Sequence, residues 1–239
     1  RHATIHQHAQ QPNDNLEHVR AVASRPPFFT DLPQISQLIL HLTTTIIPMP
    51  KSPQPHVVDP GSKVRLRDIP SDVESSYEKK SGYKKIAENV VVMADLAKRL
   101  YAENKRSGLL VLQGMDTAGK DGTIRSVMRG MNPTSCQVSS FKKPSEVELD
   151  HDFLWRVHQV VPRRGNIGIF NRSHYEDVLI VRVHSLVPKK QWSKRYDMIN
   201  DFEKLLDSCD TTIVKCFLHI SKETQRERLQ ARLDNEEKH

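Results

Sequence analysis

The 239 residues, 37% of them hydrophobic, suffice for one large domain or two small ones with a sizeable core. Residues 1–60 contain four Lys or Arg and four Asp or Glu, so the formal net charge of +7 arises wholly in residues 61–239. A basic surface there suits nucleic acid, an acidic membrane or a phosphate-rich substrate, although it is equally typical of a solubilising surface. No apolar run approaches the roughly 20 residues that cross a bilayer. The three cysteines show neither disulfide nor metal spacing, so we expect reduced thiols in a soluble cytoplasmic protein without a membrane partner.

The first 60 residues differ from the rest of the chain in composition. They hold nine of the 14 prolines and six of the 12 histidines and show no sustained helical or strand period. Their histidines lie in a Gln- and Pro-containing tract without partner cysteines, which is a poor basis for a metal site. We expect residues 1–60 to be a disordered or non-native extension and residues 61–239 to form the domain.

From about residue 84 the hydrophobic pattern becomes regular. Apolar residues recur at intervals of three and four, which predicts a long amphipathic helix that ends before Gly108: Ile86, Val90, Met93, Ala97 and Leu100. The short apolar run "LLVLQ" (109–113) then predicts a buried strand, and a second helical pattern begins near Ile124.

Between this strand and this helix lies "GMDTAGKDGT" (114–123), which matches most of a phosphate-binding loop. The pattern G-x-x-x-x-G-K-[S/T] is met by Gly114, Gly119 and Lys120, but Asp121 replaces the hydroxyl residue. An ordinary glycine turn is the simpler alternative. The order strand, loop, helix favours phosphate binding, because backbone N–H groups at a helix start cradle phosphate oxygens.

The remaining chain predicts further helices and strands in alternation. Ser145 and Glu148 form a capping-box pattern before a helix whose core candidates are Val147, Leu154 and Val157. Apolar strands are expected at 166–171 and 211–221, separated by a helix over about 192–206, and Ser221 begins a last helix. The alternation predicts an α/β fold: three layers, α/β/α, with a mostly parallel sheet, as in P-loop kinases.

Polar residues also follow the second predicted strand, in "NRSHYEDV". Ser173 and Glu176 form another capping-box pattern, so we expect a helix from about Ser173 with Glu176 and Asp177 in its first turn. Acidic residues at a helix start are common. That preference does not explain Asp177 together with Arg172 beside a strand that should neighbour the glycine loop, so we interpret this segment as functional.

These residues suit phosphoryl transfer, which needs magnesium and fixed cations around the phosphates. We predict that Asp116 and Asp177 bind Mg²⁺ and that Lys120 and Arg172 supply the cations. Asp121 should start the helix and stabilise its positive end, leaving Asp116 to face the metal. The last helix carries Arg226, Arg228 and Arg232, which form either a solvated surface or a lid over the phosphates.

Several long motifs resemble the polyphosphate kinase type 2 family: "VLQGMDTAGKDGTIR", "SFKKPSEVELDHDFLWRVHQVVP", "IFNRSHYEDVLIVRVHSLVP" and "FLHISKETQRERLQARLDNEEKH". The resemblance runs from about Val64 to the last residue. It implies a magnesium-dependent, reversible transfer of the terminal phosphoryl group of inorganic polyphosphate to a nucleoside mono- or diphosphate. It also implies that the loop and the second motif bind magnesium and phosphates, and that 226–232 begins a basic lid. Family members continue beyond "EEKH", so we expect a C-terminally truncated domain with an incomplete lid helix.

The predicted catalytic residues are therefore Asp116, Lys120, Arg172 and Asp177. The other predicted phosphate- or nucleotide-binding residues are Gly114, Ala118, Gly119, Asp121, Gly122, Thr123, Arg125, Lys142, Asn171, Glu176, Arg228 and Arg232. The expected partners are polyphosphate, nucleotides and further copies of the chain, without nucleic acid.

Two other functions remain as alternatives. An ATP-dependent P-loop nucleotide or nucleoside kinase would share the fold, but Asp121 argues against it. A basic nucleic-acid-binding protein is the other, although no recognisable binding module is present. A GTPase is disfavoured because the chain lacks an N-K-x-D segment.

Overall fold

The computed structural model describes residues 56–59, 61–71 and 79–235, with Lys79 described by its backbone alone. The chain divides into two units. The smaller includes residues 56–59 and 61–70, with the 3-10 helix η1 (Leu66–Asp68) and a hydrogen bond of 2.7 Å from Ser62 Oγ to the Asp59 carbonyl. Nearly all of the extension predicted at residues 1–60 lies outside the described residues.

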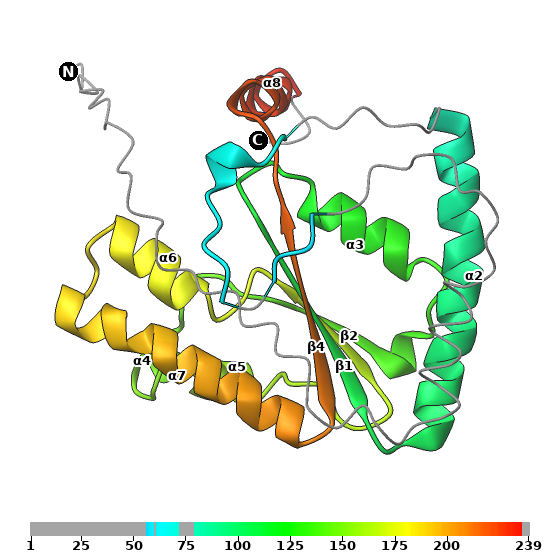
Figure 1. Cartoon of the computed structure of the whole chain (residues 1–239), viewed down its shortest axis with the longest axis horizontal. Coiled ribbons are helices and arrows are strands. Elements are labelled where there is room, and N and C mark those ends of the chain that lie inside the picture. Colours follow the sequence, from blue (N-terminus) through cyan, green and yellow to red (C-terminus); the bar gives the residue numbers. More distant parts are fainter. Residues whose placement is uncertain (1–55, 60, 72–78, 236–239) are drawn as a thin grey trace. The chain divides into compact units, whose positions relative to one another are not determined.

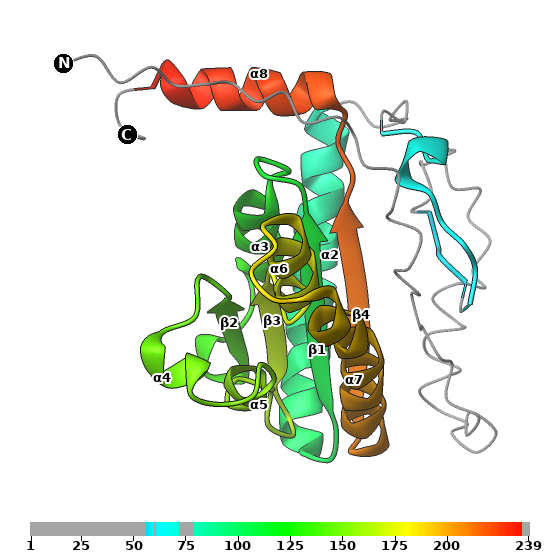
Figure 2. The same cartoon turned by 90° about the vertical axis from the view of Figure 1, so that its left-hand side faces the viewer.

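The larger unit contains a four-stranded sheet (Figure 1), and its strands lie in the order β2-β3-β1-β4 (Figure 2). The strands are β1 (Ser107–Gly114), β2 (Cys136–Ser140), β3 (Ile167–Asn171) and β4 (Thr211–Leu218). All three strand pairs are parallel, and Leu110 at the centre pairs with Ile169 on one side and Val214 on the other. The predicted parallel sheet is confirmed, and the carboxyl ends of its strands share one edge.

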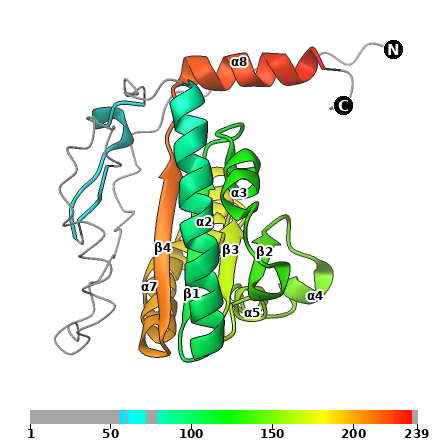
Figure 3. The same ribbon diagram turned by 90° about the vertical axis from the view of Figure 1, so that its right-hand side faces the viewer.

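Helices cover both faces of this sheet, which confirms the three-layer α/β/α prediction. Helices α2 (Lys79–Glu103) and α3 (Lys120–Met128) lie on one face, and α6 (Glu176–Val183) and α7 (Lys189–Ser208) lie on the other (Figures 2 and 3). The short elements are η2 (Pro133–Ser135), α4 (Glu146–Leu149) and α5 (Trp155–His158). Helix α8 (Lys222–Leu233) follows β4 and runs across its direction (Figure 2).

The main hydrophobic core joins the sheet to α7. Leu109 and Val111 of β1 and Phe170 of β3 are each no more than 1% exposed, and they belong to one cluster with Phe202 and Leu206 of α7. Burying one such side chain contributes about 1.5–3 kcal/mol. This cluster therefore fixes the strands whose carboxyl ends carry the predicted site.

Two parts of the fold differ from the prediction. Strand β2 was not expected, because "CQVSS" has only one large apolar residue, Val138, and this residue is 47% exposed on an edge strand. The capping box of Ser145 and Glu148 is confirmed, but α4 is one short turn and Val147 is 61% exposed rather than in the core. Val157 is fully buried, as predicted.

Candidate active site

The glycine loop connects the end of β1 to the start of α3 at the carboxyl edge of the sheet. Gly119 has φ 98°, a left-handed conformation that favours glycine. A side chain at Gly114 would place its Cβ 2.9 Å from the carbonyl oxygen of Leu218, so only glycine lets the loop start this close to β4. Thr117 also has positive φ, 62°. Such strained conformations cluster at ligand-binding sites.

Lys120 lies at the first position of α3 and is 9% exposed. Its Nζ donates to the carbonyl oxygens of Gly114, at 2.9 Å, and Met115, at 3.1 Å. Burial and the neighbouring Arg172 cation lower the pKa of Lys120 from its ordinary 10.5, although three carboxylates oppose the shift: Asp116, Glu176 and Asp121. The loop and the segment after β3 are therefore brought together around this ammonium group, as predicted.

Asp116 and Arg172 face each other across the two strand ends. Arg172 Nη2 lies 3.8 Å from Asp116 Oδ1, and the side chains are 44% and 64% exposed, respectively. Arg172 has φ 62° and its backbone N–H donates to Leu112 of β1 at 3.1 Å. An exposed pair of this kind contributes little to stability, so a phosphate or a metal can replace either partner at low cost.

Asn171 joins the end of β3 to the start of α3. Its Nδ2 donates to Asp121 Oδ1 at 2.6 Å, and Asp121 lies in the first turn of α3. A carboxylate at this position is stabilised by the positive end of the helix. Asp121 therefore has a local role available that does not involve a metal.

The carboxylate of Asp177 is buried and is held by two arginines. Its Oδ2 lies 3.0 Å from Arg156 Nη2 and its Oδ1 lies 3.7 Å from Arg195 Nη1, and its side chain is 9% exposed. Both carboxylate oxygens are thus directed at guanidinium groups. This geometry does not fit the predicted magnesium ligand. Of these two neighbours, Glu176 is the one whose charge acts on Lys120, together with Asp116 and Asp121.

The start of α6 also differs from the expected capping box. The helix begins at Glu176, and Ser173 is fully buried and accepts hydrogen bonds from Gln113 Nε2, at 3.1 Å, and from the Tyr175 N–H, at 3.2 Å. Ser173 therefore shapes the turn before the helix instead of capping it, and the prediction of a helix from Ser173 was wrong.

A buried network fixes the same segment to α7 and β4 through Glu203. Its carboxylate accepts from Tyr175 Oη at 2.7 Å and Lys215 Nζ at 2.6 Å, and it lies 3.2 Å from His174 Nε2. Burial alone would raise the pKa of Glu203, but the bonds from His174, Lys215 and Tyr175 hold it below its ordinary 4.5. The ionised carboxylate can only accept, so His174 Nε2 carries the proton.

Helix α8 contacts the glycine loop through two side chains one turn apart. Arg228 Nη1 donates to the Thr117 carbonyl oxygen and Gln225 Nε2 donates to that of Asp116, each at 3.0 Å. Arg228 therefore lies at the loop, as the lid interpretation expects. Arg232 is exposed on the same helix. Gln225 was missed, although its spacing of three from Arg228 places both on one helical face.

Two further predicted residues, Arg125 and Lys142, are exposed on the segments that follow the loop and β2. The backbone carbonyl of Lys142 accepts from Arg156 Nη1 at 3.0 Å. Arg156 and Arg195 were not among the predicted residues. A signal existed for Arg156, because it directly precedes the core candidate Val157 in an apolar stretch where an arginine needs a buried partner.

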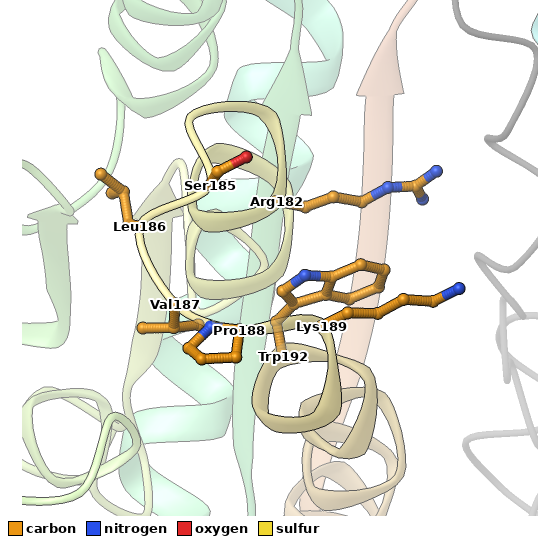
Figure 4. Close-up of a pocket in the computed structure, with 7 residues that line it drawn as sticks. All are labelled: Arg182, Ser185, Leu186, Val187, Pro188, Lys189 and Trp192. Atoms are coloured by element: carbon orange, nitrogen blue, oxygen red, sulfur yellow. The ribbon is translucent and has the colours of Figure 1, made fainter.

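A hollow of about 470 Å³ lies elsewhere, between the end of α6 and the start of α7 (Figure 4). Arg182 and Trp192 line it, with the guanidinium carbon 5.3 Å from the ring centroid. None of the predicted site residues lines this hollow. The candidate site is instead the exposed edge formed by the loop, Arg172 and Glu176.

Over residues 56–59, 61–71 and 79–235, no group of three or more His, Cys, Asp or Glu could hold a metal ion by itself. Magnesium accepts one or two carboxylates when phosphates and water complete its shell. Asp116 could serve as such a ligand, since it belongs to the glycine loop and its side chain is 64% exposed. Within the same ranges, no helix combines the length and the apolar composition of a membrane span.

Comparison with known proteins agrees with this geometry. The family model for Polyphosphate kinase 2 (PPK2) matches residues 76–239. The chain belongs to the polyphosphate kinase 2 family. The resemblance found in the sequence motifs is thereby confirmed.

Individual relatives of the polyphosphate kinase 2 family support the assignment. The AMP/ADP-polyphosphate phosphotransferase of Meiothermus ruber is 51% identical over 183 residues, covering 76% of this chain and 68% of the relative. The ADP-polyphosphate phosphotransferase of Rhodopseudomonas palustris is 49% identical, covering 76% and 67%. The crystal structure of polyphosphate kinase 2 from Arthrobacter aurescens TC1 superposes with a TM-score of 0.70 at 42% identity, covering 75% of this chain and 65% of that one. The chain thus spans about two thirds of the length of these relatives.

Proposed function

We propose that this chain carries the phosphate-binding part of a phosphotransferase that moves the terminal phosphoryl group of inorganic polyphosphate to a nucleoside mono- or diphosphate. The observation that carries the proposal is the group around Lys120, where a glycine loop, Arg172 and three carboxylates meet at one sheet edge. The names of the relatives from M. ruber and R. palustris support the substrates.

In the proposed reaction, a terminal phosphate oxygen of the nucleotide attacks the terminal phosphorus of polyphosphate. A new P–O bond forms and the bond to the next phosphate breaks, so polyphosphate becomes one unit shorter and keeps the electron pair on its new terminal oxygen. The acceptor needs no general base, because a terminal phosphate with second pKa near 6 is largely ionised at neutral pH. The reverse reaction uses the same groups.

We assign binding and charge stabilisation to residues of the two strand ends. The loop N–H groups between Gly114 and Thr123, at the start of α3, would hold phosphate oxygens. Lys120 and Arg172 would balance the charge that develops during transfer, and Arg228 would close the site from α8. In the present structure Arg228 Nη1 donates to the Thr117 carbonyl oxygen of that same loop.

The proposed cofactor is Mg²⁺, with Asp116 as the protein ligand. When bound, the ion would neutralise phosphate oxygens of donor and acceptor. Glu176 is the second candidate, because its charge acts on Lys120 and it lies at the start of α6. Asp177 is left out of the metal site because its oxygens face two arginines.

The test incubates the protein with Mg²⁺, polyphosphate and, separately, AMP, ADP, GMP and GDP, and then separates the nucleotides by chromatography. We expect a product with one more phosphate in the absence of ATP. Transfer from ATP but not from polyphosphate would favour a conventional nucleotide kinase. Salt-dependent RNA binding without any transfer would favour the nucleic-acid alternative.

The assembly of the protein also stays a prediction. We expect a homo-oligomer, and light scattering of the purified chain measures it directly. A mass equal to one chain of 27.5 kDa would contradict that expectation.

A further inference from the structure

Arg156 is a buried guanidinium that joins two separate segments of the site. Its Nη2 lies 3.0 Å from Asp177 Oδ2 on α6, and its Nη1 donates to the Lys142 carbonyl oxygen at 3.0 Å. The side chain is 7% exposed, and its central carbon lies 5.5 Å from the centre of the Phe141 ring. A planar guanidinium presents its donors in a fixed fork, so it holds both partners in one relative position.

The segment that Arg156 holds runs along the edge of the candidate site. The Phe141 N–H donates to the Asn171 carbonyl oxygen at 3.2 Å, and the Asn171 side chain reaches Asp121 on the first turn of α3. Lys142 is the next residue, and its side chain is exposed. Its main chain is therefore fixed beside the phosphate loop while its ammonium group is free to meet an anion.

Asp177 is the part of this arrangement that keeps Arg156 in place. Arg195 in turn holds Asp177, because its Nη1 donates to the Asp177 carbonyl oxygen at 2.9 Å. The guanidinium carbon of Arg195 lies 4.7 Å from the centre of the Phe153 ring. Burial makes the Asp177 charge inaccessible to ligands. The charge instead compensates the buried Arg156, which reaches the Lys142 backbone, and the partly buried Arg195.

We propose that Asp177 and Arg156 are positioning residues that hold Lys142 for the phosphate chain of polyphosphate and do not themselves touch substrate or metal. The inference rests on the proposed function. A lysine on a fixed main chain loses less conformational freedom when it binds an anion than a lysine on a loose loop, so the tether raises affinity. The substitution Arg156→Lys cannot replace the guanidinium, because one ammonium group does not reach both Asp177 and the Lys142 carbonyl oxygen in the same geometry.

The test measures binding of inorganic polyphosphate of defined length to the 239-residue chain by calorimetry, in a buffer with EDTA so that no metal contributes. The variants are Asp177→Asn and Arg156→Lys, each alone and combined with Lys142→Ala. We expect each single variant to weaken binding about fivefold. In the Lys142→Ala background the same variants should cause no further loss, because the residue through which they act is gone.

Two controls separate positioning from general damage. Asp201→Asn removes an α7 carboxylate of which 72% is exposed and which pairs with Lys204 at 3.0 Å, so it should leave the affinity unchanged. Arg156→Lys keeps a cation beside Asp177 and is the variant to use if Asp177→Asn does not fold, as thermal melting will show. Unchanged affinity in Arg156→Lys, or an equal loss with and without Lys142, overturns the inference. A wild-type chain that binds no polyphosphate overturns the proposed function itself, and the inference with it.

Discussion

The segment around the start of α6 has an exposed side, with Arg172, and a buried side, with His174 and Asp177. Arg172 is 44% exposed and faces Asp116, also exposed, while His174 and Asp177 are almost completely buried and contact partners on α7 and α5. The exposed pair contributes about 0–1 kcal/mol and can exchange partners. The buried groups cannot, because removing one partner leaves a charge without compensation. Within one short segment, the accessible residues can serve ligands and the buried ones hold them in place.

The largest expected effect comes from removing Lys120, the buried cation that Arg172 and Asp116 neighbour. Lys120→Ala should lower phosphoryl transfer by about 100-fold or more, because it removes the cation at the first position of α3, where the loop N–H groups would hold the phosphates. The rate of nucleotide formation measures it. The far-ultraviolet circular dichroism should stay as in the wild type, and near-normal transfer would remove Lys120 from the mechanism.

A substitution in the buried network around His174 should lower the stability of the protein. Glu203→Ala takes away the carboxylate that accepts from Tyr175 and Lys215, and it should cost about 3 kcal/mol in the free energy of unfolding by urea. The matched control is Glu88→Ala, which breaks an exposed pair with Lys85 on α2 and should change stability by less than about 0.5 kcal/mol. Equal losses in the two variants would contradict the difference between the two sides.

The pH dependence of this stabilisation follows from the lowered pKa of Glu203. A carboxyl group whose pKa is lower in the folded state stabilises fully above its ordinary 4.5 and loses this contribution as the pH falls through the lowered value. The difference in stability between wild type and Glu203→Ala should therefore shrink in acid. A difference that stays constant from neutral pH to well below 4.5 would contradict the assignment.

The smallest effect is expected at alkaline pH. Burial and Arg172 lower the pKa of Lys120, so its charged form is lost before that of an ordinary lysine at 10.5. Polyphosphate affinity should be constant below that lowered pKa and fall as the pH rises through it. Lys120→Arg, which stays charged, should remove this step. A step that persists in Lys120→Arg belongs to another group.

The sequence predicted those parts of the fold that long hydrophobic patterns specify. The strands β1, β3 and β4 and the helices α2, α7 and α8 lie close to where the hydrophobic patterns and the caps placed them. Strands β1 and β3 and helix α7 each bury two or three apolar residues, whereas α2 buries Ala97 and α8 has no buried residue. Strand β2 was missed because it lies at an edge and buries little. The short helix α4 has the predicted capping box, but it ends after one turn and its Val147 is exposed instead of packing in the core.

The placement of the exposed residues of the candidate site was predictable from the sequence, and that of its buried residues was not. The loop spacing and Arg172 could be read from the sequence, because glycines and a basic residue after a strand have a direct physical use. The neighbours Glu176 and Asp177 have the same charge, and only their side-chain directions separate them. That direction depends on Arg156 and Arg195, which are 20 and 19 residues from Glu176 along the chain and meet Asp177 only after folding.

The most direct measurement is the Mg²⁺ concentration that gives half-maximal transfer from polyphosphate to ADP, compared between Asp116→Asn and Asp177→Asn. If the exposed carboxylate serves the metal and the buried one only positions, Asp116→Asn raises that concentration by about tenfold or more. Asp177→Asn leaves it unchanged even where the rate falls. A shift in Asp177→Asn equal to that in Asp116→Asn, or no shift in Asp116→Asn, would contradict the account.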